Sequence, residues 1–138
     1  MRNSWTAALV FAALAVSCSQ GSEIHLYNNT TETLILTGRA YSDTLETIAV
    51  IPKETRTIPS WYENFVIESR LGRWCYDSFT DEPPVEFVAT RGFQTVRYVR
   101  GQVESDGTIF IAPKGAQVPV APSTDQPVGF PLQHHTCT

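Results

Sequence analysis

The feature that most constrains this chain is an apolar–polar alternation with a period of two, which recurs in short runs between residues 24 and 112. Successive side chains of a β-strand point to opposite faces, so this period is typical of strands with one buried face. Loops rich in proline, glycine, aspartate and asparagine separate the runs. The pattern predicts an all-β domain of roughly seven to nine short strands, either a small, mainly antiparallel β-sandwich of immunoglobulin-like type or a barrel.

Two hairpins are predicted by the spacing of these runs. Residues 24–27 should pair with residues 33–37 around the polar loop at 28–32. Residues 65–70 should pair with residues 73–79 around a short turn. Neighbouring strands joined in this way are antiparallel, which gives the expected domain its mainly antiparallel character.

A third hairpin is indicated by Asp106-Gly107, which is the clearest local signal in the chain. Aspartate followed by glycine favours a two-residue type I′ turn, because both positions of that turn need a positive φ. Such a turn would set Val103 opposite Phe110.

The N-terminus carries an apolar run, AALVFAALAV at residues 7–16, after a polar opening with one charge, Arg2. A helix of this length covers about 15 Å, roughly half of the hydrocarbon core of a bilayer, and is too short for a stable membrane anchor. The run is typical of the apolar region of a secretory signal peptide. We therefore expect residues 1–17 to be a signal peptide and the protein to be exported.

The end of this run, Ala15-Val16-Ser17-Cys18, resembles the lipobox of bacterial lipoproteins. In that family a small residue precedes an obligatory cysteine, whose thiol receives diacylglycerol before cleavage. Ser17 and Val16 match the two positions before the cysteine, whereas Ala15 stands where the family usually has leucine. The resemblance implies that Cys18 carries acyl chains such as palmitate and anchors the protein in a membrane. Ser19, where inner-membrane lipoproteins have aspartate, implies sorting to the outer membrane.

Ordinary signal-peptide cleavage is the alternative. Ala15 and Ser17 are small residues at the positions that signal peptidase requires, so a cut directly before Cys18 would release a soluble protein. A cut after Ser19 or Gly21 would remove the cysteine altogether. The product would then be periplasmic or secreted instead of anchored.

Cys75 and Cys137 remain as an even pair once Cys18 is lipidated or removed. Exported proteins occupy oxidising compartments, in which such a pair can form a disulfide. The bridge would enclose roughly 60 residues and contribute about 4 kcal/mol in the chain-entropy model. Two free thiols are the alternative.

The chain divides into four parts by composition. Residues 1–17 are the signal peptide, residues 18–22 a short linker after the lipidation site, and residues 23–112 the β domain. Residues 113–138 hold five of the nine prolines and should form an extended or disordered tail.

Several function classes are disfavoured by the sequence. The net charge of −4 at pH 7, without a basic stripe, argues against a nucleic-acid partner. The chain has no P-loop, no dinucleotide-binding glycine motif and no nucleophile elbow. The segment HHTC at 134–137 lacks the four ligands from two segments that structural zinc usually needs. We expect a protein without enzymatic activity, metal or cofactor.

Aromatic side chains cluster between residues 61 and 79. Trp61, Trp74 and Tyr76 are candidates for stacking on a glycan or a protein partner, and core packing is the alternative role. Trp74 and Tyr76 share one face of a predicted strand, and Cys75 points to the other. If Cys75 faced the core, the two aromatic side chains would be exposed.

These features together predict a cell-envelope lipoprotein without enzymatic activity. Lipid on Cys18 would tether a small β domain to a membrane, where the domain has a binding or structural role with a protein or glycan partner. The alternative function is a soluble exported binding module that uses the aromatic surface.

Overall fold

The computed structural model describes residues 20–39, 43–59, 64–77, 87–91 and 94–138. Within these residues the protein is an all-β sandwich of two sheets, which confirms the predicted fold class in its sandwich form. The described part of the chain forms nine strands: β1 Gln20–Asn28, β2 Leu34–Arg39, β3 Leu45–Val50, β4 Thr55–Pro59, β5 Phe65–Ser69, β6 Gly72–Tyr76, β7 Phe87–Arg91, β8 Gln94–Val103 and β9 Ile109–Ile111.

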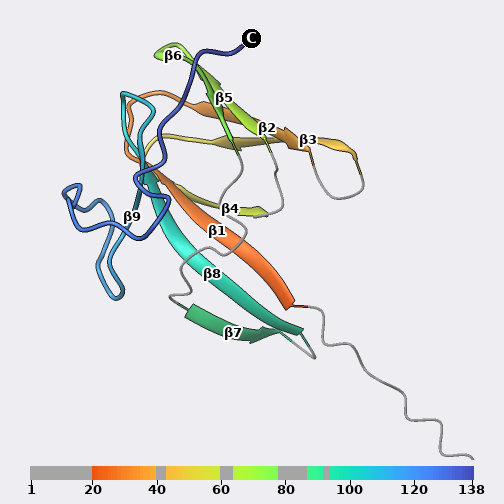
Figure 1. The fold of residues 1–138 in the computed structure, drawn as a ribbon, viewed down its shortest axis with the longest axis vertical. Coiled ribbons are helices and arrows are strands. Elements are labelled where there is room, and N and C mark those ends of the chain that lie inside the picture. Colours follow the sequence, from red (N-terminus) through yellow and green to blue (C-terminus); the bar gives the residue numbers. More distant parts are fainter. Residues whose placement is uncertain (1–19, 40–42, 60–63, 78–86, 92–93) are drawn as a thin grey trace, which may run out of the picture.

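The larger sheet has five strands in the order β4-β1-β8-β7, with β9 also pairing with β8. β1 pairs with β8 in parallel along its whole length, from Gln20 to Asn28. The other pairs of this sheet are antiparallel. Figure 1 shows β1 and β8 as two long neighbouring strands that reach away from the rest of the domain toward the N-terminal side.

The smaller sheet has four strands in the order β3-β2-β5-β6, and all of its pairs are antiparallel. The predicted hairpin of β5 and β6 is confirmed, with Ser69 opposite Gly72 at the turn. Figure 1 shows this sheet in the upper part of the molecule, across the larger sheet.

The predicted hairpin between β1 and β2 is wrong, because these two strands lie in different sheets. The connecting loop is held as an arch by Asn28, whose side chain is fully buried. Its Nδ2 donates to the carbonyl oxygens of Glu32 and Val50, both at 2.8 Å, and its Oδ1 accepts from the Thr30 amide at 2.9 Å. The alternation in both runs predicted strands correctly but did not tell which strands pair.

The hairpin of β8 and β9 is present, with a register one residue away from the predicted one. Val103 lies opposite Ile109 instead of Phe110. The turn positions Gly107 at a φ of 83°, and Asp106 is not among the residues with positive φ, so the turn is not type I′. Asp106 Oδ1 instead accepts from the Thr108 amide at 2.9 Å, which stabilises a longer loop.

The core lies between the two sheets and follows the period-two pattern. In β2, for example, Leu34 and Leu36 are fully buried while Ile35 and Thr37 are half-buried on the other face. Both sheets contribute aliphatic and aromatic side chains to one cluster, which consists of Ile24, Leu26, Leu34, Leu36, Val50, Ile58, Phe65, Ile67, Trp74, Tyr76, Val99, Val103, Ile109 and Ile111.

Candidate functional site

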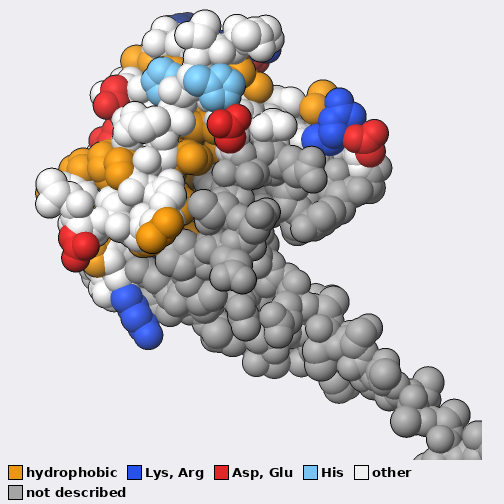
Figure 2. Space-filling model, in the orientation of Figure 1, with side chains coloured by type: hydrophobic (Ala, Val, Ile, Leu, Met, Phe, Trp, Pro, Cys, Tyr) orange, Lys and Arg blue, Asp and Glu red, His pale blue; other side chains and the backbone are white. Residues whose placement is uncertain are grey.

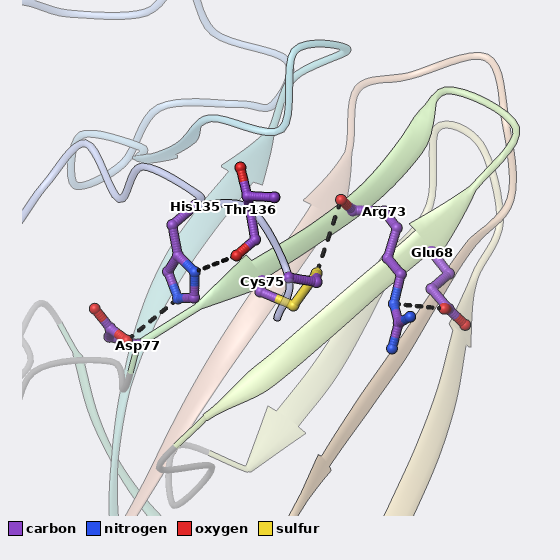
Figure 3. Close-up of a disulfide and its surroundings, with 7 residues drawn as sticks. Glu68, Arg73, Cys75, Asp77, His135 and Thr136 are labelled. Atoms are coloured by element: carbon purple, nitrogen blue, oxygen red, sulfur yellow. Dashed lines mark hydrogen bonds and ion pairs between the residues drawn. A yellow bond between two sulfur atoms is a disulfide. The ribbon is translucent and has the colours of Figure 1, made fainter.

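The disulfide between Cys75 and Cys137 is present and confirms the predicted pairing. It joins β6 to the end of the chain across 62 residues of sequence, with Cα atoms 5.2 Å apart. Figure 3 shows the bridge lying beside β6, with Arg73 of this strand on one side of it and Asp77, directly after the strand, on the other. The bridge therefore fixes the C-terminal segment to an edge of the smaller sheet.

Residues 113–138, here called the C-terminal strap, cross from one sheet to the other (Figure 1). Leu132 pairs with Ile109 of β9 through two backbone hydrogen bonds of 2.8 and 3.0 Å. His135 pairs with Cys75 of β6 through backbone hydrogen bonds of 2.9 and 3.4 Å. The strap thus connects a strand of the five-stranded sheet with the edge strand of the four-stranded sheet and closes that side of the sandwich.

Two polar side chains of β8 hold the first half of the strap. Gln102 is fully buried, and its amide pairs with both backbone groups of Val120, at 2.8 and 2.9 Å. Arg100 donates to the carbonyl oxygens of Ala116, at 2.6 Å, and Pro113, at 3.1 Å. Because proline-rich backbone cannot form a regular ladder, side chains satisfy groups that a neighbouring strand would otherwise pair.

A glutamine of the strap makes the reciprocal contact with β9. Gln126 Oε1 accepts from the Ile111 amide at 2.8 Å, and Gln126 Nε2 donates to the Ile111 carbonyl at 3.2 Å. No pattern in the sequence singles out these glutamines, since neither lies in a motif. The sequence analysis missed them for this reason.

The strap covers the aromatic end of the core. Tyr76 donates to the carbonyl oxygen of Gly107 at 2.6 Å. The ring of His134 lies 5.8 Å from that of Trp74, and its Nε2 contacts the Asp106 carbonyl oxygen at 2.9 Å. Burial, and secondly the negative charge of Asp106, raise the pKa of Tyr76 well above its ordinary value. The phenol therefore stays protonated and acts as a hydrogen-bond donor.

Of the two roles open for Trp74 and Tyr76, an exposed stacking face and core packing, the structure shows core packing. Their relative exposures are 6% and 1%, and both belong to the core cluster. Cys75 points outward instead, because its partner approaches along the outer face of β6. The third candidate, Trp61, lies outside the described residues. Burial of the pair leaves their packing role as the one that the structure supports.

The histidines near the C-terminus make separate contacts. His135 Nε2 lies 3.3 Å from Asp77 Oδ1, and its Nδ1 contacts the Thr136 carbonyl oxygen at 3.1 Å (Figure 3). His134 points to the core end instead. In the described part of the chain no three histidine, cysteine or acidic side chains come together in a way that could hold a metal ion.

An open hollow of about 590 Å³ lies at the loop end of the sandwich. Its lining mixes hydroxyl, charged and apolar side chains: Thr31, Glu32, Thr33, Ile35, Pro52, Glu68, Ser69 and Arg70. Glu68 forms an ion pair with Arg73 at 3.0 Å. The mixture suits polar ligands more than purely apolar ones.

The loops next to the hollow are held by a polar network around Asn29. Lys53 Nζ donates to the Asn29 carbonyl and side-chain oxygens at 2.9 and 3.0 Å. Asn29 Nδ2 in turn donates to both carboxylate oxygens of Glu104, at 3.1 and 2.9 Å. The network connects three loops at this end and keeps them in one arrangement.

On the face drawn in Figure 2, histidine side chains gather near the top, and acidic, basic and hydrophobic side chains are interspersed below them. This mixed surface is ordinary for a globular domain and does not mark one ligand class.

Cys18 and the leader lie outside the described residues, so the lipid-anchor prediction is neither supported nor contradicted by the fold. Among the described residues there is no helix that is long and apolar enough to cross a membrane. No protein-family model, curated protein or solved structure matches this chain.

Proposed function

We propose that this protein is a cell-envelope lipoprotein without enzymatic activity, in which lipid on Cys18 tethers the β-sandwich to a bacterial outer membrane. The observation that carries the proposal is the lipobox-like stretch Ala15-Val16-Ser17-Cys18 directly after an apolar run. A thiol at this position is the acyl acceptor of such proteins, and several acyl chains give stable anchoring where a single chain is marginal.

The disulfide supports export. Disulfides persist in the periplasm and at cell surfaces and are rare in the cytosol, and the bridge between Cys75 and Cys137 uses both cysteines other than Cys18. The one cysteine left for modification is therefore the one in the lipobox-like stretch.

The position of β1 determines how a lipid on Cys18 would orient the domain relative to the membrane. Only Ser19 separates Cys18 from Gln20, the first residue of β1, so their Cα atoms are at most about 7 Å apart. A strand of this length extends about 30 Å, and its far end leads into the loop that lines the hollow. A lipid on Cys18 would hold the start of β1 at the bilayer and present the hollow away from it.

The hollow is the surface that we assign to a protein or glycan partner in the envelope. Its hydroxyl, carboxylate and guanidinium groups can exchange hydrogen bonds with polar ligands, and Ile35 and Pro52 supply apolar contact. The exposed aromatic pair on which a soluble glycan-binding module would depend is absent from the described surface, because Trp74 and Tyr76 are buried.

Intact mass of the mature protein, combined with metabolic palmitate labelling, tests the proposal. We expect a labelled product that begins at Cys18, carries acyl chains and fractionates with the outer membrane. Cys18→Ser should lose the label and the membrane association, whereas Ser19→Ala, the matched control, should keep both. An unlabelled wild-type protein with unmodified mass would contradict the lipoprotein assignment.

A further inference from the structure

The two edge strands of the smaller sheet, β6 and β3, differ in how their outer backbone groups are paired. At β6 the backbone groups of Cys75 pair with His135 of the strap, and the disulfide lies alongside. At the other edge, β3 pairs with β2 alone among the described residues. An edge strand offers a row of N–H and C=O groups that another strand can bind.

The side chains of β3 protect this edge only in part. Natural edge strands discourage pairing with lysine, proline, bulges or inward-pointing charge. The sequence of β3, LETIAV, has no lysine and no proline, since Pro52 lies beyond its end. Its one charged residue, Glu46, is half-buried on the same face as Ile48 and Val50. Leu45 is 63% exposed and Ile51, just after the strand, is 41% exposed, and both are unusually open for large hydrophobic residues.

A second copy of β3 fits this edge in one particular register. When two copies pair antiparallel about Ile48, Leu45 of each copy lies opposite Ile51 of the other. The same register places Thr47 opposite Ala49, and both of these side chains are exposed. The dimer would therefore contain two pairs of Leu45 and Ile51, in which each large exposed side chain packs against one from the other copy. Directly opposed side chains of this kind stabilise the pairing of two strands.

Charge also favours this register. Glu46 would lie opposite Val50, so the carboxylates of the two copies are separated by four residues along the strands, about 13 Å. This distance exceeds the Debye length of about 8 Å at physiological ionic strength, so their repulsion is largely screened. Pairing about Thr47 would halve the separation and would bring Leu45 opposite the small Ala49.

The symmetry of such a pair keeps both copies facing the same way. The twofold axis that relates antiparallel neighbours is perpendicular to their sheet, so both copies of the five-stranded sheet, which contains β1, lie on the same side of the extended sheet. Closed twofold pairs are the commonest form of protein assembly.

We propose that the edge of β3 is a homodimer interface, in which two copies of this chain join their four-stranded sheets through antiparallel pairing of β3 centred on Ile48. The proposal stands independently of lipid on Cys18, because it uses only the folded domain. Its occupant is a second copy of the chain.

Two double substitutions at the same exposed positions test the interface and its register together. Thr47→Lys/Ala49→Lys places lysine opposite lysine twice and should weaken dimerisation by at least about tenfold. Thr47→Glu/Ala49→Lys places glutamate opposite lysine twice and should dimerise at least as tightly as the unmodified chain. Both variants lose the contact between the hydroxyls of Thr37 and Thr47, so this loss does not distinguish them.

The measurement is sedimentation velocity of the full exported chain with its disulfide intact, across a concentration series and in density-matched detergent where lipid is present. A dimer that is lost in the Lys/Lys variant and retained in the Glu/Lys variant supports the proposal. A chain that is monomeric at every concentration overturns it, as does a dimer that neither variant affects. A monomer whose β3 instead captures a strand of a different protein also overturns it.

Cross-linking supplies a second readout of the register. Leu45→Cys/Ile51→Cys should give a covalent dimer on a nonreducing gel, because the two new thiols lie opposite each other across the axis. Leu71→Cys, at a hydrophobic position of the turn between β5 and β6 that is as exposed as Ile51, is the control and should stay uncross-linked. Equal cross-linking in both variants would contradict the register.

Discussion

The two edge strands of the four-stranded sheet differ in whether another segment of the chain pairs with their outer backbone groups. β6 is covered by the C-terminal strap, which bonds to Cys75 and carries the partner of its disulfide. β3, at the opposite edge, has β2 as its one strand partner within the described residues. One edge is closed inside the chain, and we assign the other to a second copy.

The two edges also differ in the sequence separation of the residues that they bring together. The pairing of β3 with β2 is local, with Leu45 opposite Arg39 across a short connection. The closed edge brings together residues 62 positions apart and depends on the strap being held along its length. Long-range closure of this kind costs more chain entropy, which the disulfide and the buried side-chain contacts offset.

Removing the disulfide should have the largest effect. Cys75→Ser/Cys137→Ser opens a closed loop of 62 residues, for which the chain-entropy model gives a loss of about 4 kcal/mol in the free energy of unfolding. Guanidinium unfolding of the variant and of the oxidised wild type measures the difference. A loss below about 1 kcal/mol would show that the strap holds the β6 edge without its covalent bond.

Crowding under the strap should have the next largest effect. A Cβ at Gly107 would lie 2.6 Å from the ring of Trp74 and 2.8 Å from that of His134, and the φ of Gly107 is 83°. We expect Gly107→Ala to lower the free energy of unfolding by about 3 kcal/mol.

Gly115 is the matched control for this substitution. It has a similar φ of 78°, but a Cβ there would meet nothing within 4 Å. Gly115→Ala should therefore lower the free energy of unfolding only by the cost of a positive φ for alanine, about 1 kcal/mol. Thermal or denaturant unfolding measures both variants, and equal losses would contradict the close packing of the turn against Trp74 and the strap.

Removing the contact between Gln102 and the first half of the strap should lower the free energy of unfolding by about 2 kcal/mol. Gln102→Leu keeps the side-chain size but leaves the backbone N–H and C=O of Val120 without their partner. Gln133→Leu, which removes only a marginal 3.5 Å contact to Thr108, is the control and should change stability by less than about 0.5 kcal/mol. Similar denaturation midpoints for the two variants would mean that the buried amide does not hold the strap.

The smallest effect concerns the phenol beneath the strap and depends on pH. Tyr76→Phe removes one hydrogen bond to Gly107 and should cost about 1 kcal/mol near neutral pH. Burial and the charge of Asp106 raise the pKa of Tyr76 in the folded protein, while the unfolded chain ionises this residue at about pH 10. Its contribution is therefore fully present below about pH 10 and falls as the pH rises above that value.

Unfolding measured between neutral pH and pH 11 separates this effect. The wild type should lose stability more steeply above about pH 10 than Tyr76→Phe does, because only the wild-type residue 76 can ionise when unfolded. Identical slopes would place Tyr76 in a more polar setting than the core position described for it.

The sequence predicted what depends on alternation and on cysteine parity. Strand positions followed from runs such as Leu34 to Leu36, and the disulfide followed from the even pair. Alternation alone does not distinguish the two faces of a strand, which is why the sequence left both a surface and a core role open for Trp74 and Tyr76. Their burial depends on where Cys137 approaches β6, and that is a property of the tertiary fold.

The pairing of the strands and the contacts of the strap could not be predicted from the local sequence pattern, because they also depend on the tertiary fold. The turn residues between β1 and β2 indicated a reversal, and a hairpin and an arch between sheets have similar composition. The buried amide of Asn28, which decides between them, finds its acceptor at Val50, in another part of the chain. The bidentate contacts of Gln102 and Gln126 likewise involve partners that no sequence spacing indicates.

Amide hydrogen exchange, recorded on the oxidised and the reduced protein, tests the difference between the two edges most directly. The amides of Cys75 and His135 donate across the closed edge, and those of Ile109 and Leu132 pair the strap with β9, so all four should be protected in the oxidised protein. Reduction should release the end of the strap, so the protection of Cys75 and His135 should fall, while amides between β2 and β3 keep theirs. Equal exchange of Cys75 and His135 in both redox states would contradict closure of this edge by the disulfide-held strap.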